Sequence, residues 1–169
     1  TAYLFRDYAD KITKALGNRV YAYATFNEPF CSSYLGYEIG VHAPGLRNKG
    51  WGRQSAHHLL LAHGLAMPVL RKNDPQARHG IVLNFTPCYA ETDAAADIAA
   101  ADLADQYFNQ WYIKPLFDKA YPDCISTLPA DEQPLIQPGD FDIIAAPLDY
   151  LGINFYTRHV YRADATEGF

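Results

Sequence analysis

Cysteine is scarce in this chain of 169 residues, which contains only Cys31, Cys88 and Cys124. An odd number cannot be fully paired in disulfides, and the spacing matches neither a zinc site nor a redox-active pair. Free thiols are typical of a reducing compartment. We therefore expect a cytoplasmic protein in which these cysteines act as small buried hydrophobic residues.

Other features are missing as well. No basic stretch precedes an apolar run and a cleavage site near the start, so no signal peptide is expected. The longest apolar runs are far below the roughly 20 residues of a membrane-spanning helix, which predicts no membrane contact. The net charge of −5 argues against nucleic acid as a partner. No glycine-rich phosphate loop is present, and we expect neither a cofactor nor a metal.

Apolar and aromatic residues are plentiful by contrast, at 49% and 14% of the chain. The aromatic share fits a packed core or a cleft in which rings stack on sugars, and composition alone leaves both open. Hydrophobic periodicity predicts three helices and, between them, three short buried strands. The expected helices are 2–16, 53–71 and 94–112, and the expected strands are 20–26, 81–85 and 148–156.

The segments between these elements are expected to be irregular. Residues 30–49 contain several glycines and a proline, which predicts a long loop of functional importance. The third helix is expected to stop before Pro115, because proline breaks the hydrogen-bond pattern of a helix. Residues 118–140 are rich in proline and aspartate and should also be irregular.

The alternation of helices and strands predicts a parallel α/β sheet. The apolar run of each predicted strand terminates in an asparagine, namely Asn27, Asn84 and Asn154. The carboxyl ends of parallel strands meet at one edge, where α/β enzymes place their sites. A complete (β/α)₈ barrel needs about 250 residues. We therefore interpret residues 1–169 as a single partial barrel domain that is incomplete at both ends.

The most informative segment is Thr-Phe-Asn-Glu-Pro-Phe-Cys at residues 25–31. It places the Glu28 carboxyl at the tip of an apolar strand, where burial would raise its pKa and keep it protonated near neutral pH. A protonated carboxyl can donate to a leaving-group oxygen. Pro29 should bias Glu28 toward an extended backbone. Taken alone, a glutamate at a strand end is more often an ordinary solvated side chain.

The whole segment resembles the acid/base motif Thr-Phe/Leu-Asn-Glu-Pro of glycoside hydrolase family 1, the β-glucosidase family. The downstream Gly-Val-His-Ala-Pro-Gly at residues 40–45 resembles the loop that follows this motif, and Asp-Tyr-Leu-Gly-Ile-Asn-Phe-Tyr-Thr at 149–157 resembles the family's sixth strand. The resemblance covers essentially the whole chain. It implies the stretch of a TIM barrel from about the third helix to the sixth strand.

The resemblance also implies roles for individual residues. Glu28 matches the acid/base of a retaining mechanism, and Asn27 and Asn154 match substrate-binding amides. Asn84 matches an asparagine on the leaving-group side. Tyr156 matches a tyrosine that hydrogen-bonds the nucleophile, although plain core packing is the alternative. The list of implied substrate-binding residues is completed by Phe30, which stands where a tryptophan is commoner and keeps an aromatic wall.

The nucleophile of the family is a glutamate in an Ile/Val-Thr-Glu-Asn-Gly segment, and this sequence has no such segment. We therefore expect the isolated chain to be inactive and a complementing piece of the same barrel to be its partner. The expected substrate is a terminal β-linked glucose on an oligosaccharide or aryl glycoside, as in cellulose degradation. The alternatives are a 6-phospho-β-glycosidase and a non-catalytic sugar-binding remnant.

Histidines offer a weaker candidate site. His57, His58 and His63 share a predicted helix, but their spacing does not match a zinc-protease motif, so packing or surface positions are expected. His42 lies in the predicted loop, where substrate contact and loop support are both open.

Overall fold

The structure is a computed structural model that describes residues 1–164. Its helices and strands alternate along much of the chain. The helices are α1 (Ala2–Leu16), α2 (Lys49–Asn73), α3 (Ala95–Asp105), α4 (Trp111–Phe117) and α5 (Asp140–Ile144). The strands are β1 (Ala22–Asn27), β2 (Arg78–Phe85), β3 (Cys88–Ala90), β4 (Tyr150–Phe155) and β5 (His159–Tyr161).

Short helical segments complete the description. Two are π-helical, η2 (Cys31–Glu38) and η3 (Gln106–Gln110). Three are 3₁₀ turns, η1 (Gly17–Arg19), η4 (Asp123–Thr127) and η5 (Ala130–Glu132).

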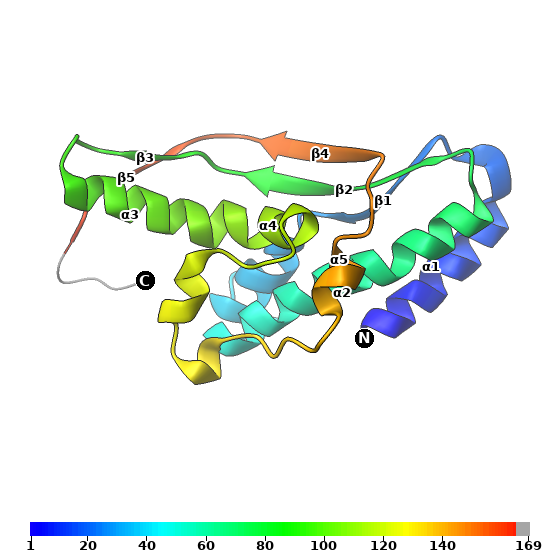
Figure 1. Ribbon diagram of the computed structural model, residues 1–169, viewed down its shortest axis with the longest axis horizontal. Coiled ribbons are helices and arrows are strands. Elements are labelled where there is room, and N and C mark those ends of the chain that lie inside the picture. Colours follow the sequence, from blue (N-terminus) through cyan, green and yellow to red (C-terminus); the bar gives the residue numbers. More distant parts are fainter. Residues whose placement is uncertain (165–169) are drawn as a thin grey trace.

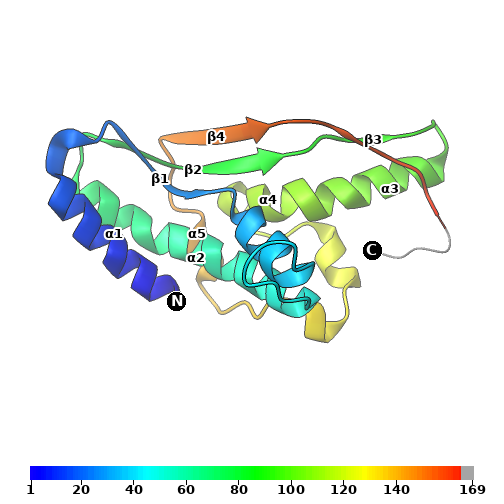
Figure 2. The same ribbon diagram turned by 180° about the vertical axis from the view of Figure 1, so that it is seen from behind.

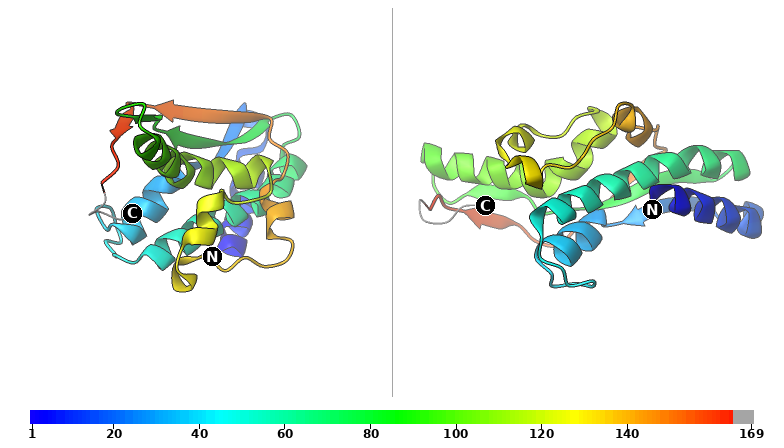
Figure 3. Two further views of the ribbon diagram at one scale, coloured as in Figure 1. Left: turned by 60° about the vertical axis from the view of Figure 1, so that its left-hand side comes forward. Right: turned by 90° about the horizontal axis from the view of Figure 1, so that it is seen from below.

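The main sheet has the order β1-β2-β4, and both pairings are parallel, as the alternation of elements predicts. The helices lie on one side of this sheet, and no described element covers the other side (Figures 1 and 3). A second, two-stranded parallel sheet is formed by β3 and β5. It continues the line of β2 and β4 beyond their carboxyl ends (Figures 1 and 2). This layering is the one expected for a sector of a barrel wall, with helices outside.

The core lies between the sheet and the helices. Ile81 and Leu83 of β2 are at most 1% exposed and belong to one cluster with Leu60 of α2, Trp111 of α4 and Ile144 of α5. These side chains fix the helices against the back of the sheet. The polar strand ends described below are therefore held by a rigid scaffold.

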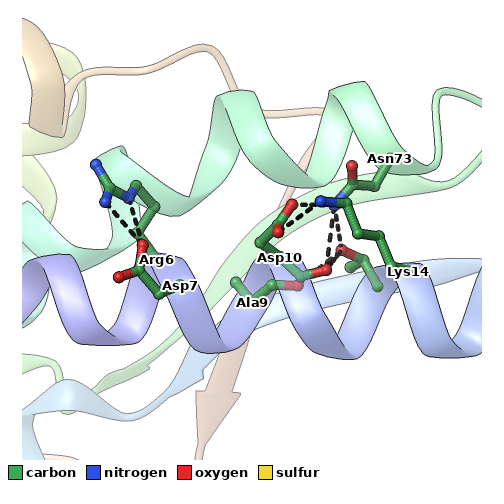
Figure 4. Close-up of polar contacts among 7 residues, drawn as sticks. Arg6, Asp7, Ala9, Asp10, Lys14 and Asn73 are labelled. Carbon is green, nitrogen blue, oxygen red and sulfur yellow. Dashed lines mark hydrogen bonds and ion pairs between the residues drawn. The ribbon is translucent and has the colours of Figure 1, made fainter.

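Helix α1 packs along α2, and polar contacts align the two helices. Asn73 of α2 donates hydrogen bonds to Asp10 Oδ1 at 2.9 Å and to Thr13 Oγ1 at 2.9 Å (Figure 4). Lys14 also contacts the Asp10 carboxylate at 2.7 Å. The hydrogen bond from Asn73, followed by that from Lys14, lowers the pKa of Asp10.

Two predictions about local structure were wrong, and two short strands were missed. The segment expected to be a loop from residue 30 to 49 begins with the π-helix η2. The helix expected to stop before Pro115 continues to Phe117, because Pro115 and its neighbour Leu116 are buried and their packing outweighs one lost hydrogen bond. The segment 118–140 is largely irregular, as expected, with two short 3₁₀ turns, whereas β3 and β5 were not predicted.

Gly64 gives a test of the packing between α2 and α5. A Cβ atom there would lie 2.0 Å from the carbonyl oxygen of Ile143, which is backbone and cannot easily move. Gly64→Ala should lower the free energy of unfolding by about 1–3 kcal/mol, although alanine favours helix. Urea unfolding followed by circular dichroism measures it, with Lys72→Ala on an exposed position of α2 as the control. Equal stability of the two variants would contradict this close contact.

Candidate active site

The carboxyl ends of the three main strands bring polar side chains together. Asn84 of β2 is paired in register with Asn154 of β4. The Asn154 amide donates to Asn27 Oδ1 at 3.0 Å and to Glu28 Oε1 at 2.8 Å. Residues from β1 and β4 thus share one hydrogen-bonded cluster, and β2 lies between them.

A β-bulge aims Glu28 into this cluster. The register with β2 advances by three residues in β1, from Ala24 to Asn27, and by two in β2, from Gly80 to Val82. One extra residue in β1 bends the strand and re-aims the side chains that follow.

The backbone of Glu28 is left-handed, with φ at +50°, so the expectation of an extended conformation before Pro29 was wrong. The chain must turn there because Cys31 N donates back to Glu28 O at 2.9 Å as η2 begins. Such a conformation costs roughly 1–3 kcal/mol for a residue with a side chain and is typical of functional sites.

Both oxygens of the Glu28 carboxyl accept hydrogen bonds. Tyr156 Oη donates to Oε1 at 3.2 Å, beside the Asn154 amide, and the Cys31 thiol donates to Oε2 at 3.1 Å. Burial raises the pKa of Glu28, but these three donors together lower it below its ordinary value. The expectation of a raised pKa was therefore wrong for this chain, because hydrogen bonds to a carboxylate favour its charged form.

The π-helix η2 follows Glu28 in the chain, and hydrogen bonds and an ion pair fix it near both of its ends. Ser33 Oγ donates to the carbonyl of Pro29 at 2.7 Å and bonds Tyr112 Oη at 2.9 Å. At its far end, the buried carboxylate of Glu38 accepts a hydrogen bond from Tyr107 and lies 3.8 Å from the Arg53 guanidinium. These contacts fix the segment that positions Glu28.

A cavity of about 440 Å³ lies beside the rim of the sheet, between η2, β2, η3 and β5. Phe30 and Asn84 both line it, so the structure places these two predicted site residues there rather than in hydrogen-bonding contact with Glu28. Phe30 stacks on Tyr34 with ring centroids 4.9 Å apart. The cavity therefore lies next to the polar cluster around Glu28.

Of the three histidines of α2, His57 and His63 bond residues of other elements, whereas the partner of His58 lies in α2 itself. His57 bonds Tyr121 Oη at 2.8 Å and Asp140 Oδ2 at 3.0 Å. His58 bonds Gln54 at 3.2 Å. Within residues 1–164, no three His, Cys, Asp or Glu side chains are grouped so that they could hold a metal ion.

His63 supports the strand that carries Glu28. Its Nδ1 bonds Thr25 Oγ1 of β1 at 2.7 Å, and the ring is completely buried. Burial lowers the pKa of His63 from 6.5 to about 4. A histidine with a depressed pKa stabilises the fold only while it is neutral, because below pH 6.5 the unfolded chain takes up a proton that the folded chain excludes.

Acidification should therefore destabilise the protein through His63. The free energy of unfolding should fall by up to about 3 kcal/mol as the pH falls from 6.5 to 4. Urea unfolding at several pH values measures this, with His63→Gln expected to show a weaker dependence over the same range. An identical pH dependence in His58→Gln and His63→Gln would contradict the assignment.

All three cysteines are free thiols, as expected. Sequence reasoning missed the contact of Cys31 with Glu28. Burial and the neighbouring carboxylate raise the pKa of Cys31 to about 11, so the group is a protonated thiol that can donate. Cys31 is three residues after Glu28, and a helical turn brings such residues side by side. The contact was missed because this segment was predicted to be a loop.

Comparison with known proteins gives this geometry a context. The profile described as Glycosyl hydrolase family 1 matches residues 1–169, the whole chain. The chain belongs to glycosyl hydrolase family 1. The fold is accordingly part of the α/β TIM barrel that the sequence predicts, and the open side of the sheet corresponds to the barrel interior.

Two relatives of this chain are named as β-glucosidases. A β-glucosidase of Agrobacterium sp. is 38% identical over 168 residues, which are 99% of this chain and 37% of that protein. A bifunctional β-D-glucosidase/β-D-fucosidase of Bifidobacterium breve is 35% identical over 164 residues, covering 95% and 34%.

A solved structure of the virulence factor SghA of Agrobacterium tumefaciens, in complex with its substrate analog salicin, superimposes with a TM-score of 0.94 at 36% identity. It covers 99% of this chain and 37% of that one. The chain thus spans a little over a third of the length of these family 1 proteins. No described helix is both long enough and apolar enough to cross a membrane.

Proposed function

We propose that this chain supplies the acid/base half of the active site of a retaining β-glucosidase, with Glu28 as the acid/base. The observation that carries the proposal is the Glu28 carboxyl at the carboxyl rim of a parallel sheet, hydrogen-bonded by Asn154, Tyr156 and Cys31. The curated relatives of the chain are β-glucosidases, which supports the reaction class.

The reaction is a double displacement. A second carboxylate attacks the anomeric carbon from a position about 5–5.5 Å from the acid/base, and Glu28 gives its proton to the departing oxygen. The products of this step are a glycosyl ester and a free alcohol. Glu28, now a carboxylate, takes a proton from water as the water oxygen attacks the anomeric carbon and releases the sugar.

The lowered pKa of Glu28 suits the second of these steps. Three donors stabilise the carboxylate that must accept a proton from water. In a complete barrel, the charged nucleophile beside it would raise the pKa of Glu28 until that charge disappears in the ester. The same carboxyl can then serve as an acid in the first step and as a base in the second.

The other predicted residues would orient the sugar and its leaving group. We propose that the amides of Asn27 and Asn154 bind glycone hydroxyls, since an amide can both donate and accept. Asn84 and Phe30 line the neighbouring cavity and would face the leaving group. Tyr156 is 77% exposed on the open side, where its hydroxyl could also reach the nucleophile of a complete barrel.

The 169-residue chain alone should not hydrolyse glucosides. The buried carboxylate of Glu38 is held by Tyr107 and Arg53 and does not serve as the second carboxyl. Purified chain should leave 4-nitrophenyl β-D-glucoside intact, and addition of a polypeptide with the remaining strands of the barrel should start hydrolysis. Turnover by the chain alone that depends on Glu28 would show that the nucleophile lies within it.

A broader glycone range is a second candidate. The Bifidobacterium breve relative has both β-D-glucosidase and β-D-fucosidase activity, which favours tests of both sugars. Comparison of 4-nitrophenyl β-D-glucoside, β-D-fucoside and 6-phospho-β-D-glucoside in the barrel-length enzyme separates these specificities. Binding of glucose without turnover by a full-length protein that lacks the second glutamate would favour a sugar-binding role instead.

A further inference from the structure

The two oxygens of the Glu28 carboxyl lie in different surroundings. Oε1 accepts from the Asn154 amide at 2.8 Å and from Tyr156 Oη at 3.2 Å. Oε2 accepts from the Cys31 thiol at 3.1 Å, which is the one hydrogen bond to this oxygen within residues 1–164. A carboxylate oxygen has two lone pairs. Both lone pairs of Oε1 are therefore occupied, whereas Oε2 keeps one that is open to a proton.

The backbone sets the position of the Cys31 side chain. Cys31 N donates to Glu28 O at 2.9 Å, and Ser33 Oγ donates to the carbonyl of Pro29 at 2.7 Å. The first turn of η2 is thereby closed on the residue that it follows. Sγ of Cys31 contacts Oε2 from this turn, while the amide of Asn154 contacts Oε1 from β4. Two elements thus hold one oxygen each and fix the rotation of the carboxyl about its Cγ–Cδ bond.

The Cys31 thiol remains a donor at neutral pH. Burial, followed by the neighbouring Glu28 carboxylate, raises the pKa of Cys31 to about 11, so Sγ keeps its proton. A thiol is a weak donor, yet among the three hydrogen bonds that lower the pKa of Glu28 it ranks second, after that of Asn154. Such a donor can orient Oε2 and still leave this oxygen free to carry a proton.

We propose that Cys31 is a positioning residue for the acid/base, and that its thiol holds Oε2 as the oxygen that exchanges the proton. The inference rests on the proposed function for the role of Glu28. In the first step the Oε2–H bond breaks, and the proton passes to the glycosidic oxygen as that oxygen leaves the anomeric carbon. In the second step Oε2 takes a proton from water as the water oxygen bonds to the anomeric carbon. Sγ keeps its own proton in both steps.

The pKa of Glu28 in the 169-residue chain tests the contact without any turnover. It is measured by carbon-13 NMR titration of the side-chain carboxyl, whose signal is identified by its loss in Glu28→Gln. Cys31→Ala removes the donor and should raise this pKa by at least about 0.5, because a hydrogen bond to a carboxylate favours its charged form. Cys31→Ser keeps a hydroxyl donor and should lie closer to the unchanged chain. Cys124→Ala removes a thiol from the core cluster and should cause no shift.

The pH profile of the barrel-length enzyme tests the role in catalysis. The loss of kcat/KM at high pH reports the pKa of the general acid in the free enzyme. For a glucoside with a poor leaving group, Cys31→Ala should move this loss to higher pH by the same amount as in the NMR titration. For an activated aryl glucoside, whose rate is set by hydrolysis of the ester, kcat should fall by about tenfold, a part of the 10²–10⁴-fold that acid–base catalysis contributes. KM should fall with kcat because the ester accumulates, and Cys31→Ser should restore both.

The outcomes separate this inference from the proposed function. An unchanged or lowered pKa of Glu28 in Cys31→Ala overturns the inference, and so does an equal shift in Cys124→Ala or a Cys31→Ser variant that behaves like Cys31→Ala. A raised pKa with an unmoved pH profile overturns the positioning role. A raised pKa in a barrel-length enzyme whose rates do not depend on Glu28 would overturn the proposed function and leave the contact intact. If circular dichroism shows that Cys31→Ala is unfolded, Cys31→Val takes its place, because valine also lacks a donor.

Discussion

Replacement of Glu28 by glutamine should slow hydrolysis of glucosides with poor leaving groups by about 10²–10⁴-fold, the usual contribution of general acid catalysis. The amide keeps the size of the carboxyl and can still contact Asn154 and Tyr156, so binding should change little. Hydrolysis of an aryl glucoside with a very acidic phenol should be affected much less in its first step, because that leaving group needs no proton. The measurement is kcat/KM across a series of leaving groups in the barrel-length enzyme.

The control for this prediction is Glu91→Gln, an exposed carboxylate of the segment that follows β3. It should leave the dependence on leaving group unchanged. An unchanged rate with cellobiose in Glu28→Gln would refute the assignment of Glu28. An equal loss for all leaving groups would indicate a role in folding or binding instead of proton transfer.

The buried network around Arg53 should have the largest effect on stability. The Arg53 side chain is 4% exposed and contacts three segments: Nε donates to Tyr107 Oη at 2.9 Å, Nη1 contacts Glu132 Oε2 at 2.5 Å, and Glu38 lies within 3.8 Å. Burial raises the pKa of Glu38, whereas Tyr107 and Arg53 act in the opposite direction. The guanidinium thus compensates a carboxylate that water does not reach.

Arg53→Met should therefore lower the free energy of unfolding by about 3–5 kcal/mol, because it leaves the Glu38 carboxylate buried without its cation. The double variant Arg53→Met, Glu38→Gln removes that charge and should recover part of the loss. Lys119→Met breaks the exposed pair with Asp142 and should cost at most about 1 kcal/mol. Urea unfolding compares the three, and a loss in Arg53→Met no larger than in Lys119→Met would contradict the account.

Much of the fold followed from local patterns. Short continuous apolar runs indicated buried strands, and the helical spacing of residues such as Leu60 indicated helices with one buried face. The alternation of these strands and helices along the chain predicted a parallel α/β sheet. The ends of β1 and β4 were recognisable from their asparagines, because parallel strands place their carboxyl ends at one edge. The predicted position of Glu28 depended on the same argument.

The details of the site depend on contacts between residues that are far apart in the chain, and the sequence does not show which of them meet. Asn154 and Tyr156 are 126 and 128 residues from Glu28 in the chain, so the hydrogen bonds that lower its pKa were not predictable from its neighbours. The left-handed backbone of Glu28 lies where the chain turns from β1 into η2, and the bulge just before it can be recognised only from the register with β2. The cavity wall depends in the same way on β5, a strand of three residues.

The product formed with azide tests the role of Glu28 most directly. In Glu28→Ala, the missing carboxyl leaves space for azide, which needs no base to attack the glycosyl ester. A barrel-length Glu28→Ala variant given an activated aryl glucoside and azide should turn over faster than without azide and yield β-glucosyl azide, identified by the coupling constant of its anomeric proton. An α-glucosyl azide, or glucose alone at a rate that azide does not change, would contradict Glu28 as the acid/base of a retaining enzyme.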